Sequence, residues 1–450
     1  MSNSVPPGPY GLLSLGNGRS APLYLIDFDK EGRSEGPLTR KHLLDTARES
    51  NFTDIYVLSH GWNNTFKDAV GLYDRLLTGY LGERQVLGIN GADLYRPLYV
   101  GIIWPSTALV LPWEEAPDFA GGGTDDLTER RDQGRTERHE IAQQLKDADI
   151  PRFYELAEKT SLTKGEALEF AQILASIWAD ADGEIPSTEV APTPEEMVEL
   201  WARVDARSGN SSRKEHGFAD DDDTEPGPGA AGFLDFLDPR KPIQLATVRL
   251  MKDRSGRIGS KGVAPLLTEL LTLSAARVHL VGHSYGCRVV LSALSYRSDI
   301  PRKVHSVLLL QPATSYLCFA ADAGAGKPGG YRPALERTET PIFSTFSPHD
   351  APLTRLFHLA VRRKSDLGDQ QIAGIPPSKF AALGGFGPGG LGTAVQEVRM
   401  APKPFRYPIP GAGVRVFALL GTDGISGHSD VTNRYTWWAM LNQTSGDHLP

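Results

Sequence analysis

Cysteine is nearly absent from the 450-residue chain, which contains only Cys287 and Cys318. Their spacing fits neither a set of zinc ligands nor a disulfide framework, so we predict no metal site and no disulfide scaffold. Cys287 lies three residues after Ser284, at a position where a helix is expected to face the sheet. We therefore interpret Cys287 as a small buried apolar residue.

Positive charge is also limited, with 47 lysine and arginine residues against 55 aspartate and glutamate residues and a formal net charge of −8. This balance argues against binding of nucleic acids and of anionic membrane surfaces, since both require basic patches. No apolar run approaches the roughly 18 residues of a transmembrane helix, so we expect no stable membrane insertion. The N-terminus lacks the basic and apolar regions of a secretory signal peptide. We expect a cytoplasmic protein, with export by a route that needs no cleavable signal left open.

Short apolar runs separated by helical patterns are what the sequence does contain. A hairpin is predicted over residues 12–28, and a helical pattern at 70–80 separates the first two later runs. These runs are apolar on both faces, as a parallel sheet covered by helices requires. We predict an α/β fold with a single domain over residues 1–450. The later runs are 54–60, 98–104, 277–282, 307–310, 341–346 and 414–420.

Residues 106–240 depart from this alternation and are interpreted as a large helical insertion between two strands. Capping boxes at 163–166 and 193–196 precede apolar helical stripes. We expect the stripes to pack on each other and on the sheet, while part of the insertion could cover the active site as a lid. Residues 207–232 have too little apolar surface to pack, so we predict that they form a mobile loop. Its acidic run at 220–223 lacks the spacing of a calcium-binding loop.

A glycine-rich segment, residues 384–392, resembles a phosphate-binding loop only in its glycine content. It is not followed by the Lys-Ser/Thr pair that opens a helix after such a loop. We interpret it as a flexible connection, and we predict that the protein uses no cofactor.

The most informative stretch is residues 278–290, where a short apolar run leads through Gly-His-Ser-Tyr-Gly at 282–286 into a helical pattern. A Gly-x-Ser-x-Gly turn between a strand and a helix is typical of a nucleophile elbow. The flanking glycines are needed because the turn packs too tightly for a Cβ atom, while the serine is held in a strained, exposed conformation. Ser284 is therefore the candidate nucleophile. The motif alone would also suit an ordinary strand–helix turn with glycines for packing.

Two further candidates for catalysis follow later strand runs. Asp350 comes 66 residues after Ser284, and His428 comes 78 residues after Asp350. Ligands of open α/β sheets bind at the carboxyl ends of the strands, where these residues are expected to meet. A serine hydroxyl needs a neutral imidazole to take its proton, and a carboxylate holds that imidazole in the correct tautomer. The order serine, acid, histidine differs from the chymotrypsin and subtilisin orders.

Alternatives to this assignment stay open. Asp350 would also suit the N-cap of a following helix, and His428 could be an ordinary loop histidine. Asp322 and Asp366 are the fallback acids. Asp430, two residues after His428, is badly placed to orient the imidazole ring.

Acyl transfer also needs donors that stabilise an oxyanion. We assign these donors to the backbone N–H groups of Tyr285, directly after the nucleophile, and of Trp62, in the loop after the run 54–60. A plain strand–helix turn is the alternative explanation for this loop. The candidate substrate-binding residues beside these donors are His60, Gly61, Asn63 and His283.

With these motifs in place, the chain resembles the α/β-hydrolase superfamily, near bacterial serine hydrolases of unassigned substrate. The resemblance covers roughly 10–105 and 240–441 and does not include the insertion. It implies an α/β-hydrolase fold with an eight-stranded, mostly parallel sheet flanked by helices, a Ser/Asp/His triad and two backbone oxyanion donors. The motifs are His-Gly-Trp-Asn at 60–63, Trp-Pro-Ser at 104–106, Gly-His-Ser-Tyr-Gly at 282–286 and Gly-His-Ser-Asp at 427–430.

We expect a metal-independent serine hydrolase that cleaves carboxylic esters through an acyl-enzyme on Ser284, with a small-molecule or lipid ester as substrate. A lipase or phospholipase used as an effector is the alternative within the enzyme class, motivated by the Trp- and Leu-bearing insertion. The same triad would also serve thioester or amide cleavage. A non-catalytic scaffold whose insertion binds a protein partner is the alternative outside that class. The sequence makes no prediction of the oligomeric state.

Overall fold

The computed structural model describes most of the chain in several segments. These are residues 7–62, 64–89, 95–106, 138–179, 193–199, 201, 238–296, 300–324, 326–356, 381–408 and 410–445.

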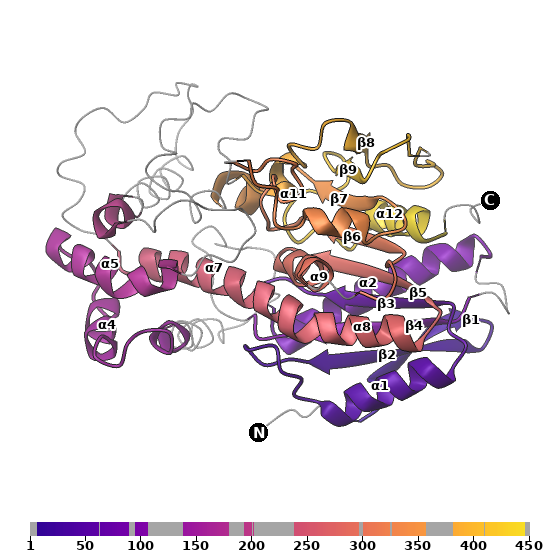
Figure 1. The fold of residues 1–450 in the computed structure, drawn as a ribbon, viewed down its shortest axis with the longest axis horizontal. Helices are drawn as coiled ribbons and strands as arrows, with labels where there is room; N and C mark the ends of the chain where they lie inside the picture. The colour runs from indigo at the N-terminus through magenta and orange to yellow at the C-terminus, as the bar shows by residue number, and fades with distance from the viewer. Residues whose placement is uncertain are drawn as a thin grey trace, which may run out of the picture.

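A nine-stranded sheet forms the centre of the molecule, with the strand order β1-β2-β4-β3-β5-β6-β7-β9-β8 (Figure 1). Only β1 runs antiparallel to its neighbour, and every other pair is parallel. The strands are β1 (Gly11–Gly16), β2 (Arg19–Asp27), β3 (Asp54–Ser59), β4 (Pro97–Ile103), β5 (Arg277–His283), β6 (Ser306–Leu310), β7 (Ile342–Phe346), β8 (Val395–Arg399) and β9 (Val416–Leu420).

Helices cover both faces of this sheet, as its apolar strands require. One hydrophobic cluster joins the sheet to α1, α7, α8 and α9, and a second joins it to α2 and α12. The helices are α1 (Pro37–Glu49), α2 (Phe66–Val86), α4 (Ile150–Ala157), α5 (Lys164–Ala179), α7 (Arg240–Arg257), α8 (Ala264–Leu273), α9 (Tyr285–Ser295), α11 (Leu383–Phe386) and α12 (Arg434–Ser445). Shorter helical segments are Ile258–Val263, Arg332–Glu336, Pro352–Leu356 and Gly392–Ala394. Among the described helices, none has the length and apolarity that crossing a membrane needs.

The α/β architecture and the predicted strand runs are confirmed, but the expected number of strands is wrong. The sheet has nine strands because β8 adds an edge beyond β9. This strand has a single buried residue, Val398, and no continuous apolar run, so its sequence lacked the signal that marked the other strands. The segment 384–392 also differs from the expected flexible connection. Its first residues, 384–386, belong to α11, and Gly384 and Gly385 are buried there against Leu353.

The described part of the insertion packs into the main core. Both predicted capping boxes form, with Thr163 and Glu196 each bonded to its partner across the helix start. Buried Phe153, Phe170 and Trp201 belong to the cluster that also contains the residues of α9. The predicted mobile acidic loop at 207–232 lies outside the described residues.

Candidate active site

The predicted nucleophile elbow lies between β5, which ends at His283, and α9, which begins at Tyr285. Ser284 has φ 55° and ψ −123°, a positive φ that a non-glycine residue adopts only under strain. A Cβ atom on Gly286 would come within 2.2 Å of the Ser59 carbonyl oxygen. The glycine is therefore required by the close approach of β3. Cys287 is fully buried, as predicted.

Ser284, His428 and Asp350 form a continuous chain of hydrogen bonds. His428 Nε2 lies 2.8 Å from Ser284 Oγ, and His428 Nδ1 lies 2.8 Å from Asp350 Oδ2. A carboxylate only accepts, so Nδ1 carries the hydrogen and Nε2 accepts the serine hydroxyl. This is the tautomer that a general base needs to take the serine proton. The structure thus brings together the three residues that the sequence placed at separate strand ends.

The exposure of the three side chains decreases from the base to the acid. The His428 side chain is 22% exposed, Ser284 is 5% exposed and Asp350 is fully buried. The serine is thus less exposed than the motif suggested, because the loop at Gly61 lies over it: a Cβ atom on Gly61 would come within 2.6 Å of Ser284 Cβ. Of the three side chains, the imidazole of His428 is the most exposed to solvent.

Both carboxylate oxygens of Asp350 accept hydrogen bonds. Oδ1 accepts the backbone N–H of Leu353 at 3.0 Å, and Oδ2 accepts the Gln311 side-chain amide at 2.8 Å besides His428. The bond to Leu353 caps the helical segment Pro352–Leu356, so the alternative reading of Asp350 as a cap describes a second task of the same side chain. The sequence did not single out Gln311 as a functional residue. Its signal was its position directly after β6, where the predicted strand run ends.

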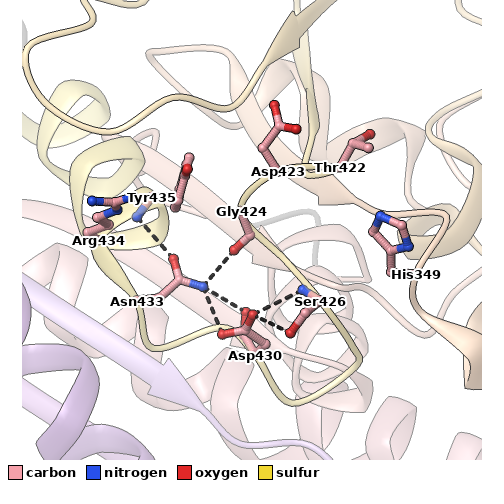
Figure 2. A pocket seen from close by; sticks show the side chains of 9 residues that line it. All are labelled: His349, Thr422, Asp423, Gly424, Ser426, Asp430, Asn433, Arg434 and Tyr435. Atoms are coloured by element: carbon pink, nitrogen blue, oxygen red, sulfur yellow. Dashed lines mark hydrogen bonds between the residues drawn. The ribbon is translucent and has the colours of Figure 1, made fainter.

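The loop that carries His428 is held by its own polar residues. Asp430 accepts hydrogen bonds from the backbone and hydroxyl of Ser426, while the Asn433 amide donates to Asp430 and to the carbonyl of Gly424 (Figure 2). Burial alone would raise the pKa of Asp430, but the bonds from Asn433 and Ser426 bring it below its ordinary value. As expected, Asp430 shapes the loop and does not orient the imidazole.

A surface pocket of about 390 Å³ lies beside this loop, lined by His349 and by residues of the segment 422–435 (Figure 2). Neither Ser284 nor His428 lines it. The pocket therefore belongs to the outer side of the loop and is not the place where an acyl group would meet the nucleophile.

His283 is bonded to the backbone of the loop that carries His428. Its buried Nε2 lies 3.0 Å from the carbonyl oxygen of His428, and the two rings are 5.2 Å apart. Burial lowers the pKa of His283 to about 3, so the ring is neutral and donates through Nε2. The side chain thus anchors the backbone of His428, and its contact with a substrate stays a prediction.

His60 is also engaged by its surroundings. The ring is buried and stacks on Trp104 at 5.3 Å. Its Nδ1 lies 2.8 Å from the Gly61 carbonyl, and its Nε2 accepts the backbone N–H of Trp104 at 3.3 Å. Burial lowers the pKa of His60 to about 4. With both nitrogens engaged, His60 positions the loop, and its contact with a substrate stays a prediction.

Tyr73 also holds this loop, and the sequence marked it only as an apolar residue of a helix. Its hydroxyl accepts the backbone N–H of His60 at 2.8 Å and donates to the carbonyl of Ile102 at 2.5 Å. α2 thereby ties the end of β3 to the end of β4. Hydrophobic periodicity does not predict such a bond, because it shows only that the Tyr73 side chain packs in the core.

The two predicted oxyanion donors lie on the segments that meet at Ser284. Tyr285 is the first residue of α9. Trp62 follows Gly61, and its ring lies 6.1 Å from the ring of Tyr285. The remaining candidate in this loop, Asn63, lies outside the described residues.

The structure describes one of the two fallback acids, Asp322. Asp322 is exposed and accepts the backbone N–H groups of Gly324 and Gly326, as in a tight turn. Asp366 lies outside the described residues. Within the part of the chain that the structure describes, no group of three or more His, Cys, Asp or Glu side chains is arranged to hold a metal ion.

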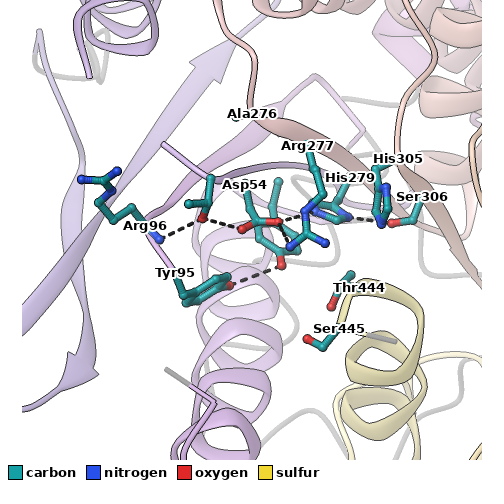
Figure 3. A network of polar contacts seen from close by, with 12 residues as sticks. Asp54, Tyr95, Arg96, Ala276, Arg277, His279, His305, Ser306, Thr444 and Ser445 are labelled. Atoms are coloured by element: carbon teal, nitrogen blue, oxygen red, sulfur yellow. Dashed lines mark hydrogen bonds and ion pairs between the residues drawn. The ribbon is translucent and has the colours of Figure 1, made fainter. Parts of the chain in front are cut away.

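A second Ser-His-Asp arrangement lies at the opposite ends of the strands (Figure 3). His279 Nε2 is 3.0 Å from Asp54 Oδ1, and His279 Nδ1 is 2.8 Å from Ser306 Oγ. All three side chains are at most 1% exposed, and Arg277 pairs with Asp54 at 2.7 Å. Because these side chains are buried, a substrate cannot reach them, and their hydrogen bonds link β3, β5 and β6. Residue types alone would not distinguish this Ser-His-Asp arrangement from the one formed by Ser284, His428 and Asp350.

Comparisons with protein families, with curated proteins and with solved structures found no match. The interpretation of the site therefore depends on the chain's own residues and geometry.

Proposed function

We propose that the chain is a serine hydrolase with an α/β-hydrolase fold that cleaves carboxylic esters through an acyl-enzyme on Ser284. The observation that carries the proposal is the pair of 2.8 Å hydrogen bonds that link Ser284 through His428 to Asp350. The strained backbone of Ser284 at a strand–helix turn adds to it, because strain of this kind concentrates at functional sites.

Acylation follows from the arrangement of these groups. His428 Nε2 takes the proton of Ser284 Oγ as the oxygen attacks the ester carbonyl carbon. The carbonyl oxygen becomes an oxyanion, for which the backbone N–H groups of Trp62 and Tyr285 are the proposed donors. The imidazolium, stabilised by Asp350, then gives its proton to the departing alcohol as the tetrahedral intermediate collapses.

Deacylation repeats these steps with water. His428 takes a proton from a water molecule that attacks the acyl carbon, and it returns that proton to Ser284 Oγ when the carboxylic acid leaves. Asp350 stays ionised throughout, because its task is to hold the tautomer and to balance the charge on the ring.

An ester substrate is favoured over an aggregated lipid by the packing of the described part of the insertion. A lipid-binding lid would need an unpartnered apolar face, whereas Phe153, Phe170 and Leu174 are fully buried in the main cluster. In the described part of the insertion, the apolar stripes that suggested a lipid substrate are thus used for packing.

The proposal is tested by labelling with a fluorophosphonate, which reacts with activated serine nucleophiles. We expect the wild-type protein to label at a rate comparable with a control esterase, and Ser284→Ala not to label. His428→Ala should keep its circular dichroism spectrum and urea midpoint but lose most labelling and turnover. The proposal fails if folded wild-type protein does not label, or if Ser284→Ala labels equally.

A further inference from the structure

Gln311 is a buried side chain that the proposed reaction does not use. It directly follows β6, is fully buried and has φ 43°, a left-handed conformation that is costly for a residue with a Cβ atom. Such strain persists only where the surroundings determine the conformation, and it concentrates at functional sites. The side chain therefore needs an explanation.

The hydrogen bonds of Gln311 allow a single orientation of its amide. Nε2 lies 2.8 Å from Asp350 Oδ2 and 3.1 Å from the carbonyl of Gly384, and both oxygens only accept. Thr345 Oγ1 accepts the backbone N–H of Gln311 at 2.8 Å and donates to Oε1 at 2.9 Å. Every polar group of the side chain is satisfied, so neither rotation nor an amide flip is available.

We propose that Gln311 is a positioning residue that fixes the orientation of the Asp350 carboxylate towards the base. The inference rests on the proposed function of Ser284. Oδ2 receives both the Gln311 amide and His428 Nδ1, while Oδ1 is occupied by the backbone of Leu353. The carboxylate is thus held from both sides, and rotation about its Cβ–Cγ bond would break at least two hydrogen bonds.

A neutral donor suits this position for an electrostatic reason. A lysine or arginine would pair with Asp350 and reduce the negative charge that stabilises the imidazolium. An amide directs the oxygen without cancelling that charge. The left-handed φ brings the amide to Asp350, and the fit is close, since a Cβ atom on Gly384 would come within 2.6 Å of the Gln311 carbonyl carbon.

The test measures the second-order rate of fluorophosphonate labelling between pH 5.5 and 8.5 for Gln311→Met and Gln311→Glu. Gln311→Met removes the donor at similar size, so labelling should fall roughly 10- to 100-fold at every pH. In Gln311→Glu two carboxyl groups share a proton at low pH, and the protonated glutamic acid donates in place of the amide. Its rate relative to wild type should be highest near pH 5.5 and fall about tenfold or more as both groups ionise.

The matched control is Gln443→Met. Gln443 is also a buried glutamine, but its amide donates to the carbonyls of Val307 and Pro341, away from the triad. This variant should be less stable in urea yet label with the wild-type pH profile. The positioning role is overturned if Gln311→Met labels within threefold of wild type, or if the Gln311→Glu ratio does not change with pH. Failure of folded wild type to label would instead count against the proposed function.

Discussion

Asp350 shows how completely a single side chain is constrained at the residue scale. Oδ1 accepts from a backbone amide, and Oδ2 accepts from a neutral amide and from the imidazole. All three neighbours are donors, so only a group that accepts at both oxygens fits. The three donors around Asp350 therefore select a carboxylate at this position.

We expect Asp350→Asn to lower kcat by about 10⁴-fold with the fold retained. The asparagine must present an NH₂ group either to Leu353 or to Gln311 and His428, and each arrangement sets donor against donor. When the NH₂ faces His428, it stabilises the tautomer with the hydrogen on Nε2, which cannot accept the proton of Ser284. The measurement is ester hydrolysis together with circular dichroism.

Asp322→Asn is the control for this variant. Asp322 is exposed and its Oδ1 accepts two turn amides. Since an asparagine carbonyl accepts equally well there, activity should remain within about twofold of wild type. Equal losses in both variants would show that Asp350 has no special role.

The identities of the site residues were more predictable than their orientations. Ser284, Asp350 and His428 could be found because polar residues at the carboxyl ends of parallel strands converge. The same rule placed His60 and His283 nearby, but it carries no information on where a ring points. Both rings turn towards backbone carbonyls, of Gly61 and His428, which a sequence pattern does not report.

At the element scale, the loop after β3 and the elbow after β5 are fitted against each other. A Cβ atom on Gly61 would come within 2.6 Å of Ser284 Cβ and 3.1 Å of the His283 carbonyl. These contacts involve backbone and the proposed nucleophile. The clash could therefore be relieved only if the loop after β3 or the elbow after β5 moved. The proposed oxyanion donors lie one on each segment, and their separation depends on this contact.

Gly61→Ala should therefore lower the rate of fluorophosphonate labelling by about 100-fold, the effect of a displacement near 1 Å in a reacting site. The loss should appear in the rate rather than in the secondary structure. Labelling kinetics and circular dichroism measure the two separately. Wild-type kinetics in a folded Gly61→Ala protein would contradict the proposed placement of the oxyanion loop.

Gly82→Ala provides the matched control on α2, the helix that follows this loop. Gly82 is exposed, and a Cβ atom there meets nothing within 4 Å. Alanine favours the helix, so the variant should be more stable by roughly 0.5–1 kcal/mol and label as wild type does.

The elements themselves could be predicted where burial is strong on both faces. The six residues of β3 and the seven of β4 are all buried, and their continuous apolar runs were clear. β8 was missed because an edge strand pairs on one side only and needs few apolar residues. α1 was missed because its buried residues, Thr39, Leu43 and Ala47, form a stripe too narrow to stand out.

At the scale of the whole molecule, three buried histidines lie at opposite ends of one sheet. Burial lowers the pKa of His60 and of His279 to about 4 and that of His283 to about 3, against an ordinary value of 6.5. Each ring is neutral in the folded protein but takes up a proton more readily when the chain unfolds. Their contribution to stability is therefore fully present above pH 6.5 and is lost as the pH falls towards 4.

Among the described residues, the half-buried Asp27 acts in the opposite direction. Burial raises the pKa of Asp27 to about 6, so its contribution is lost as the pH rises through that value. A tenfold change in proton affinity corresponds to about 1.4 kcal/mol. Three histidines shifted one way outweigh one aspartate shifted the other, so acid should destabilise the fold before the remaining carboxylates protonate.

We expect the urea midpoint of the wild-type protein to fall steadily between pH 7 and pH 4.5. His279→Gln keeps a donor towards Asp54 but does not titrate, so its midpoint should be lower at pH 7 and fall less steeply with acid. His349→Gln is the control, because His349 is exposed and its loss should leave the wild-type slope unchanged. An equal slope in His279→Gln and wild type would mean that protonation of the buried network does not drive acid unfolding, and that the depressed pKa of His279 is not a source of stability.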